Sequence, residues 1–247
     1  MTRPPPLPDA GRLIEVCEAT WPPATRRRVG AWTIRDGQGG GSRVSAATED
    51  WPVTDADLPA AEAAMRALGQ VPLFQIREGE DKLDELLARH GYVIHDPVNI
   101  YATPVTRLLG HEIAPGTAYA MWPPLELVRD IWASGGIGHG RLAVMDRARG
   151  PKAAILVRVG DEPGGAGFVA IHEGIAMLHA IHVRPRQRRQ GAATLIIRKA
   201  AQWAAENGAD VLSLIVTQGN HAANPLYVSL GMSLVGHYHY RRLVEGA

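Results

Sequence analysis

The sequence has little cysteine, no long apolar run and no surplus of either charge. The single cysteine, Cys17, excludes an intramolecular disulfide and any zinc or iron–sulfur site that needs several cysteines. The 26 Lys and Arg residues against 25 Asp and Glu give a net charge of +1, which is too small for binding nucleic acid by overall charge. No run of about 18 apolar residues occurs, and the opening MTRPPPLPDA has no apolar core of secretory length. We therefore expect a soluble, cytoplasmic protein with no membrane partner.

What is present suffices for a sizeable core. Of the 247 residues, 46% are hydrophobic and 21% are charged, which excludes wholesale disorder. At about 150 residues per domain, this length gives one or two domains. Proline and glycine mark the divisions. Residues 1–10 are predicted as a flexible N-terminus, 11–104 as one small α/β unit, 105–117 as a linker, and 118–247 as a second unit.

The first unit is predicted to mix short helices with short strands. Helices are predicted at 11–19, 57–68 and 82–90, strands at 31–36, 42–48 and 71–76, and extended segments at 92–94 and 98–103. The glycine run at 37–41 is interpreted as a flexible hairpin between two strands. The arginines at 26–28 are interpreted as a solvated surface.

The second unit is predicted to alternate strands and helices around a mixed sheet. Strands are predicted near Tyr119 and at 152–159, 165–172, 175–183, 211–217 and 232–243, and helices at 124–133, 140–148, 191–207 and up to Leu230. Glu173-Gly174 is a two-residue hairpin signal. The continuous apolar strand 211–217 is predicted to be buried on both faces.

The most informative stretch runs from 175 to 194. An apolar strand ends at Val183, a loop with several arginines follows, and a helix begins near Gly191. The unpaired N–H groups and positive dipole end of a helix N-terminus bind phosphate, and a glycine there lets an anion approach the backbone. The stretch therefore predicts a phosphate site. The alternative is an ordinary basic loop that caps a core helix.

A second stretch, 217–232, follows the buried strand. Positions 223, 226, 227 and 230 have the spacing of one helical face, so Tyr227 is predicted to point inward. A buried phenol needs a hydrogen-bond partner. The alternative is that Tyr227 is simply a core aromatic residue.

Together the two stretches resemble a known family. The pattern R-x-x-G-x-A at Arg188, Gly191 and Ala193 resembles the acyl-CoA motif of the GNAT superfamily of N-acetyltransferases. The pattern N-x-x-A-x-x-L-Y-x-x-L-G from Asn220 to Gly231 is similar to the family's later motif. The departures are Ala193 in place of the commoner second glycine and Met232 in place of the usual Phe. The resemblance covers about 118–243.

The resemblance implies an α/β fold of the GNAT type for the second unit and a role for each motif residue. The backbone of Ile181, His182 and Val183 would pair with the pantetheine amides, like an added strand in a gap beside the strand 211–217. Asn220 would touch the pantetheine arm, and Tyr227 would protonate the departing thiolate. The pyrophosphate would be held by the loop and first helical turn, at Arg188, Arg189, Gln190, Gly191, Ala192, Ala193 and Thr194.

The attacking amine must also lose protons. His179 lies on the acyl-CoA strand, where some family members place a histidine that relays a proton, and its ordinary pKa near 6.5 suits that task. The alternative is a histidine packed within the sheet. His182 is predicted to lie on the opposite face of the strand. His237 and His239 alternate on a late strand and are candidates for lining the substrate side. No metal site is expected.

We therefore predict an acetyl-CoA-dependent N-acetyltransferase that transfers acetyl directly to a primary amine of a small molecule or peptide. The order of elements in residues 11–104 is similar to a degenerate GNAT half, as in tandem members of the family, and this unit is predicted to shape the acceptor pocket. A monomer or homodimer without a nucleic-acid partner is expected. Two alternatives remain, a non-catalytic acyl-CoA-binding module and an RNA-binding protein that uses 184–189.

Overall fold

Two β-sheets organise the chain, which a computed structural model describes over residues 6–243. The smaller sheet has the order β1-β2-β3, and the larger, eight-stranded sheet has the order β4-β11-β5-β10-β9-β8-β7-β6. The first five residues of the predicted flexible N-terminus and the last four residues lie outside the described residues. The strands are β1 (Thr25–Val29), β2 (Trp32–Asp36), β3 (Thr48–Glu49), β4 (Leu73–Arg77), β5 (Tyr92–Pro104), β6 (Ala118–Met121), β7 (Lys152–Val159), β8 (Glu162–His172), β9 (Ile175–Val183), β10 (Val211–Thr217) and β11 (Ser233–Leu243).

Helices cover both sheets. They are α1 (Ala10–Thr20), α2 (Ser42–Ser45), α3 (Leu58–Arg66), α4 (Asp81–Arg89), α5 (Glu126–Ser134), α6 (His139–Arg147), α7 (Ala192–Glu206) and α8 (Ala223–Ser229), with single 3₁₀ turns at Asp55–Asp57, Val105–Arg107 and Pro185–Gln187. Most predicted elements are confirmed with small shifts at their ends. Strand β7 has the predicted bounds, and Gly208 follows α7 with the left-handed φ of +82° expected of a helix-ending glycine.

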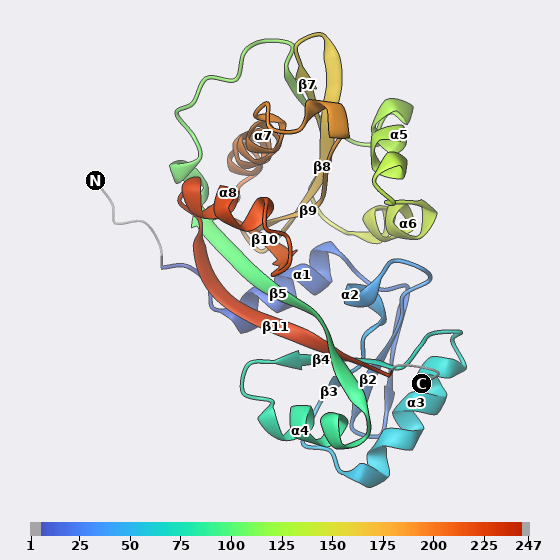
Figure 1. Cartoon of the computed structure of the whole chain (residues 1–247). Coiled ribbons are helices and arrows are strands. Elements are labelled where there is room, and N and C mark those ends of the chain that lie inside the picture. Colours follow the sequence, from blue (N-terminus) through green and yellow to red (C-terminus); the bar gives the residue numbers. More distant parts are fainter. Residues whose placement is uncertain (1–5, 244–247) are drawn as a thin grey trace.

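Strands β5 and β11 connect the two predicted units. Both extend between the upper part of the molecule, beside α8, and the lower part, beside α4 (Figure 1), β5 running upward and β11 downward. Strand β5 ends at Pro104, where the predicted linker begins, and pairs antiparallel with both β10 and β11. The residues of the first unit therefore join the sheet of the second. The division into 11–104 and 118–247 stays a prediction.

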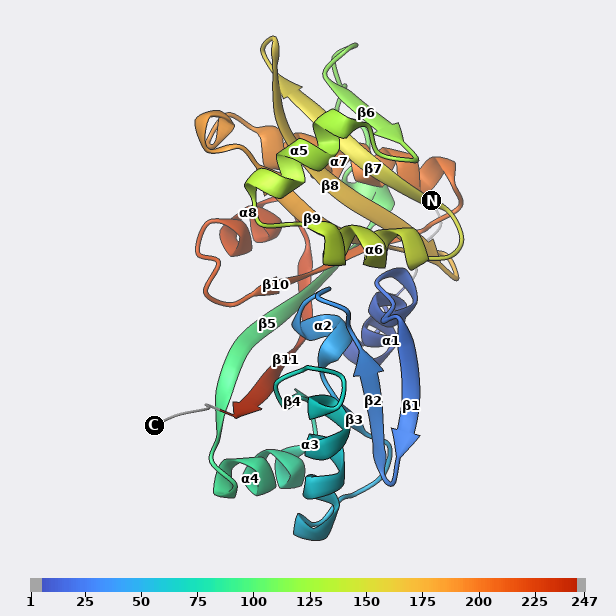
Figure 2. The ribbon, with the colours of Figure 1, turned by 90° about the vertical axis from the view of Figure 1, so that its right-hand side faces the viewer.

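The upper part of the large sheet carries helices on both faces. Helix α7 packs on one face, while α5 and α6 lie on the other, in front of β7–β9 in Figure 2. Side chains of α7 at i, i+4 and i+8, namely Ile196, Ala200 and Ala204, are fully buried. Strand β8 makes room for this helix, because a Cβ at Gly167 would lie 2.8 Å from Ile196 Cγ2. The sequence thus places small residues where helix and sheet meet most closely.

The prediction of a single strand at 42–48 is wrong. This segment forms the short helix α2 and then the two-residue strand β3, not one strand. Strand β2 pairs with β3 on one side and, on the other, with β1, which was not predicted. The arginines of β1 are exposed, as expected of a solvated surface. The predicted extended segments 92–94 and 98–103 are one strand, with an irregularity at Asp96, whose φ is +42°.

The glycine run at 37–41 is likewise not a flexible hairpin between two strands. It leads from β2 into α2 and packs against α6. A Cβ at Gly40 would lie 2.5 Å from Val144 Cγ2, and a Cβ at Gly140 would lie 2.5 Å from the Gly39 carbonyl oxygen. Glycines are required here because two backbones approach each other, which ties the first unit to α6.

Candidate active site

Strands β9 and β10 separate partway along their length. Their parallel pairing runs from Val211↔Ile175 to Leu214↔Leu178 and then stops. Just beyond, Ala180 has a left-handed φ of +51°, and the β8–β9 register shifts there. The Ala180 carbonyl oxygen accepts a hydrogen bond of 2.9 Å from Trp132 Nε1, which fixes this bulge. The predicted gap beside 211–217 is therefore present, and we call it the β9–β10 split.

The loop before α7 presents unpaired amides. Gly191 is the N-cap residue of α7, with a φ of +84° and no side-chain cap hydrogen bond, and no neighbour lies within 4 Å of where its Cβ would be. Arg189 is also left-handed, with a φ of +63°. The first backbone bond of the helix is donated by Leu195, so the N–H groups of its first turn are available to an anion.

A cavity of about 590 Å³, the larger cavity, joins this loop to the β9–β10 split. Of the predicted site residues, Gln190 does not line it, because its side chain donates a 2.8 Å hydrogen bond to the Arg186 carbonyl. The unpredicted Gln187 lines it instead. The predicted residues that line it are Ile181, His182, Val183, Arg188, Arg189, Gly191, Ala192, Ala193, Thr194, Asn220 and Tyr227.

Tyr227 lines the larger cavity from α8. Its side chain is 5% exposed, and its ring centroid lies 5.6 Å from that of Tyr101 on β5. Burial, and next the neighbouring Tyr101, raise the pKa of Tyr227 to about 12, so the phenol stays protonated at neutral pH. A protonated phenol in a partly dry cavity is a hydrogen-bond donor toward a developing negative charge.

Asn224, which sequence reasoning missed, holds the loop between β10 and α8. Its Oδ1 accepts hydrogen bonds from Asn99 Nδ2 at 3.0 Å and from the Tyr101 hydroxyl at 3.1 Å. Its Nδ2 donates to the Thr217 and Asn220 carbonyls at 3.1 and 2.9 Å. The only sequence signal was an asparagine before a proline at the start of a helix. Asn224 thereby fixes both Asn220 and the start of α8.

His179 lies in the core and does not line the larger cavity. Its side chain is 3% exposed, and Trp21 stacks on the ring with centroids 5.0 Å apart. Burial, and next the charge of Arg43, hold the pKa of His179 well below its usual value, so the imidazole is neutral.

Both ring nitrogens of His179 have partners. Nε2 lies 2.9 Å from Thr20 Oγ1, and Nδ1 lies 3.4 Å from a guanidinium nitrogen of Arg43. Because Thr20 Oγ1 donates to the Val16 carbonyl and Arg43 can only donate, the tautomer protonated at Nε2 satisfies both contacts. These contacts favour the packed alternative over a general base.

The predicted placement of His182 on the opposite face from His179 is wrong. His179 pairs with Phe168 and His182 with Ala166, two strand residues that share one face. The bulge at Ala180 inserts an extra residue into β9, so both histidines point toward the face that carries α5 and α6. Sequence alternation alone does not show a bulge.

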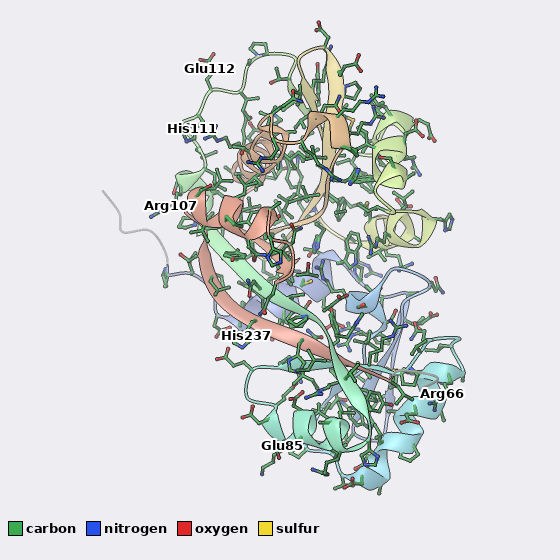
Figure 3. All side chains as sticks on the ribbon, in the orientation of Figure 1. Arg66, Glu85, Arg107, His111, Glu112 and His237 are labelled. Carbon is green, nitrogen blue, oxygen red and sulfur yellow. The ribbon has the colours of Figure 1, made fainter. Side chains whose placement is uncertain are left out.

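The other two candidate histidines, His237 and His239, also lie elsewhere than the sequence analysis predicted. His239 Nε2 lies 2.7 Å from Asp84 Oδ1 on α4, and His237 projects from the outer side of β11, away from α2 and α6 (Figure 3). Their neighbour Tyr240 faces the inner side. The interpretation of His237 and His239 as residues of the substrate side is therefore wrong.

A second cavity of about 220 Å³, the smaller cavity, lies on the other side of the β9–β10 split. Ala180 and Thr217 line it from β9 and β10. The rest of its wall comes mainly from the first unit. These residues are Trp21, Gly40, Gly41, Ser42, Arg43, Asp96, Val98 and, from elsewhere, Arg141 and Tyr240.

Two further features bear on the chemistry. Cys17 is 4% exposed, and burial raises its pKa to about 11, so it is a buried thiol and not a nucleophile. Within residues 6–243, no group of three His, Cys, Asp or Glu side chains is placed to hold a metal ion. No helix of this described part has the length and apolarity needed to cross a membrane.

Comparisons with known proteins agree with this geometry. Residues 125–232 match the model of the acetyltransferase (GNAT) family. The uncharacterized N-acetyltransferase YobR of Bacillus subtilis is 26% identical over 246 residues, which cover 95% of this chain and 99% of that protein.

Solved structures share the fold over most of the chain. A GCN5-related N-acetyltransferase from Kribbella flavida has a TM-score of 0.70 at 21% identity, covering 96% of both chains. A tandem GNAT protein from the clavulanic acid biosynthesis pathway has a TM-score of 0.61 at 14% identity, covering 100% of this chain and 91% of that one. Both likenesses extend over nearly the whole of this chain.

The split sheet and the uncapped helix thus belong to a mixed α/β fold of the GNAT type. Residues 125–232 form a domain of the acetyltransferase (GNAT) family.

Proposed function

We propose that this protein transfers the acetyl group of acetyl-CoA directly to a primary amine of a small molecule or peptide. The observation that carries this proposal is that the β9–β10 split separates two cavities, one beside the uncapped start of α7 and one beside the first unit. One cavity suits a nucleotide thioester, and the other suits the acceptor. The amine class rests on the resemblance to the family.

The residues present fit an acyl-CoA. The amides from Gly191 to Thr194 and the arginines of the preceding loop would hold the pyrophosphate, and the open space over Gly191 lets it approach. The backbone of residues 181–183 would pair with the pantetheine amides as an added strand in the split. Asn220, which caps the loop through a 3.1 Å bond to the Ala223 amide, would border the pantetheine arm.

Acetyl-CoA supplies an activated thioester. The amine nitrogen attacks the carbonyl carbon, so a C–N bond forms as the C–S bond breaks, the sulfur gains a proton and the nitrogen loses one. Tyr227, which lines the larger cavity, would donate the proton to the sulfur, and its raised pKa keeps the phenol protonated throughout the neutral range. No step uses Cys17, because its thiol is buried outside the larger cavity.

The competing function is an acyl-CoA-binding module without turnover. The buried phenol of Tyr227 in the larger cavity favours an enzyme, because binding alone does not require a proton donor at this place. The test is free-thiol release from acetyl-CoA with a panel of amines, alongside calorimetric binding of CoA. Amine-dependent thiol release supports the enzyme, and CoA binding without release with any amine supports the module.

A third outcome would point to RNA. Steeply salt-dependent RNA affinity that CoA does not compete would assign the arginine loop to nucleic acid instead. We propose further that the protein acts in the cytoplasm, as a monomer or homodimer, and that residues 11–104 shape the acceptor side.

A further inference from the structure

The smaller cavity carries charge that the acyl-transfer chemistry itself does not use. Two guanidinium groups, those of Arg43 and Arg141, line it together with one carboxylate, that of Asp96. Its volume of about 220 Å³ is below the 300–1,000 Å³ typical of cavities for drug-sized ligands. A small acceptor therefore fits better than a folded protein surface.

Arg43 is held in place without being neutralised. It comes from α2, and its guanidinium makes long contacts of 3.4 Å to His179 Nδ1 and 3.3 Å to the Ile215 carbonyl, with Tyr238 as a further neighbour. None of the ion pairs formed among residues 6–243 involves Arg43. A half-buried guanidinium with five donors and no carboxylate partner is a ready site for an anion.

Arg141 reaches the same cavity from α6. Its Nε and one terminal nitrogen both lie 3.7 Å from where a Cβ at Gly41 would be, so the guanidinium lies over the glycine run. This side chain is exposed, and in the described part of the chain it too forms no ion pair with a carboxylate. The two arginines thus come from the two predicted units and converge on one small space.

Asp96 supplies the opposite charge. It interrupts β5 with a φ of +42°, a conformation that Asp tolerates better than most residues, and its carboxylate lies 3.3 Å from His95 Nε2. With two guanidinium groups against one carboxylate, the cavity disfavours an acceptor that carries several amines. It favours an acceptor with one positive and at least one negative group.

We propose that the acceptor is a small amine that also carries a carboxylate, such as an amino acid, and that Arg43 and Arg141 bind its carboxylate. This inference rests on the proposed function. Ala180 and Thr217, which line the same cavity at the β9–β10 split, leave the amine end facing the thioester side. Bidentate guanidinium–carboxylate pairing would fix the orientation of the acceptor and set its specificity.

The test compares each amino acid with its own primary amide, which has the same amine but no carboxylate. For a panel of α-, β- and γ-amino acids, thiol release from acetyl-CoA gives kcat/KM for each acid and amide. We expect at least one acid to exceed its amide by about 10-fold or more, because a hydrogen bond to a charged group contributes that much. Decarboxylated amines should behave as the amides do.

Variants then assign the preference to the arginines. Arg141→Gln, at an exposed position, should reduce the acid-over-amide ratio about 10-fold, and Arg43→Gln should reduce it at least as much. Arg89→Gln removes an exposed charge at the end of α4 and should leave the ratio unchanged. Acetyl-CoA affinity, measured by calorimetry, should be unaffected in all three. If Arg43→Gln does not fold, the Arg141→Gln result decides alone.

The outcomes separate this inference from the proposed function. If amides and decarboxylated amines react as well as the acids, or if Arg141→Gln leaves the ratio intact, the carboxylate acceptor is wrong while acetyl transfer stands. If no amine in the panel causes thiol release and acetyl-CoA does not bind, the proposed function fails and this inference fails with it.

Discussion

The two cavities at the β9–β10 split differ in how the chain builds them. All residues that line the larger cavity come from one stretch of the chain, between residues 181 and 227. The smaller cavity is assembled from positions between 21 and 240 that meet only in the folded chain. The larger cavity is therefore encoded by local motifs, and the smaller cavity by the packing of the first unit against α6 and β9.

Among the substitutions that test this difference between the two cavities, the largest effect is expected at Tyr227. Tyr227→Phe removes the proton donor from the larger cavity but keeps the ring, so turnover should fall about 100-fold for every amine. The affinity for acetyl-CoA should change less than about twofold, since the ring packing is retained. Steady-state kinetics and calorimetry measure the two quantities.

The matched control is Tyr101→Phe, which removes a hydroxyl one ring away that donates to Asn224. Its turnover should remain within about fivefold of wild type. Equal losses in the two variants would contradict the assignment of Tyr227 as the donor to sulfur.

A smaller effect is expected at the phosphate loop. Gly191→Ala places a side chain at a left-handed position beside the first-turn amides, and it should weaken acetyl-CoA binding about 10-fold through strain and obstruction. Gly208→Ala is the matched control at the other end of the same helix, with a φ of +82° and equally open surroundings. It should cost stability similarly but leave the affinity unchanged. If both variants bound acetyl-CoA with equal affinity, the assignment of the pyrophosphate site to Gly191 would be wrong.

The smallest effect is expected at His179, which lies in the core beside Arg43. Because its pKa is depressed in the folded state, the unfolded chain takes up a proton first as the pH falls below about 6.5. The free energy of unfolding should therefore decrease by up to about 1.4 kcal/mol per pH unit in that range. His179→Gln should be less stable near neutral pH but show a shallower decrease.

The control for this measurement is the exposed His237→Gln, which should keep the wild-type dependence on pH. A general base at position 179 predicts something else, namely a turnover loss in His179→Gln that is rescued at high pH. That result would show that His179 acts as a general base, and it would contradict the assignment of His179 as a packed, neutral imidazole.

The sequence predicted most residues of the larger cavity, because the patterns that identify them involve residues close together in the chain. The helix start at Gly191 and the inward face that carries Tyr227 follow from short-range spacing, and the gap beside 211–217 is what the family resemblance implies. The structure contains each of them. The Gln190 side chain turns back to the Arg186 carbonyl, which spacing does not reveal, so any contact of Gln190 with the pyrophosphate would be through its backbone amide.

The acceptor side was predicted poorly because its geometry depends on tertiary contacts. The bulge at Ala180 reverses the face of His182, and the packing of the glycine run against α6 converts a presumed hairpin into a cavity wall. Arg43 lay within a segment predicted as a strand, so its placement in α2 beside His179 was not foreseen. Contacts between residues far apart in the sequence leave no periodic pattern that could be detected.

The most direct test of the split-sheet site is a crystal structure of the protein with bound coenzyme A. We expect the diphosphate to lie against the amides from Gly191 to Thr194, the pantetheine arm to run along residues 181–183, and the sulfur to reach the side of Tyr227. Coenzyme A bound elsewhere, or a larger cavity closed by side chains at saturating ligand, would contradict the site and the function proposed from it.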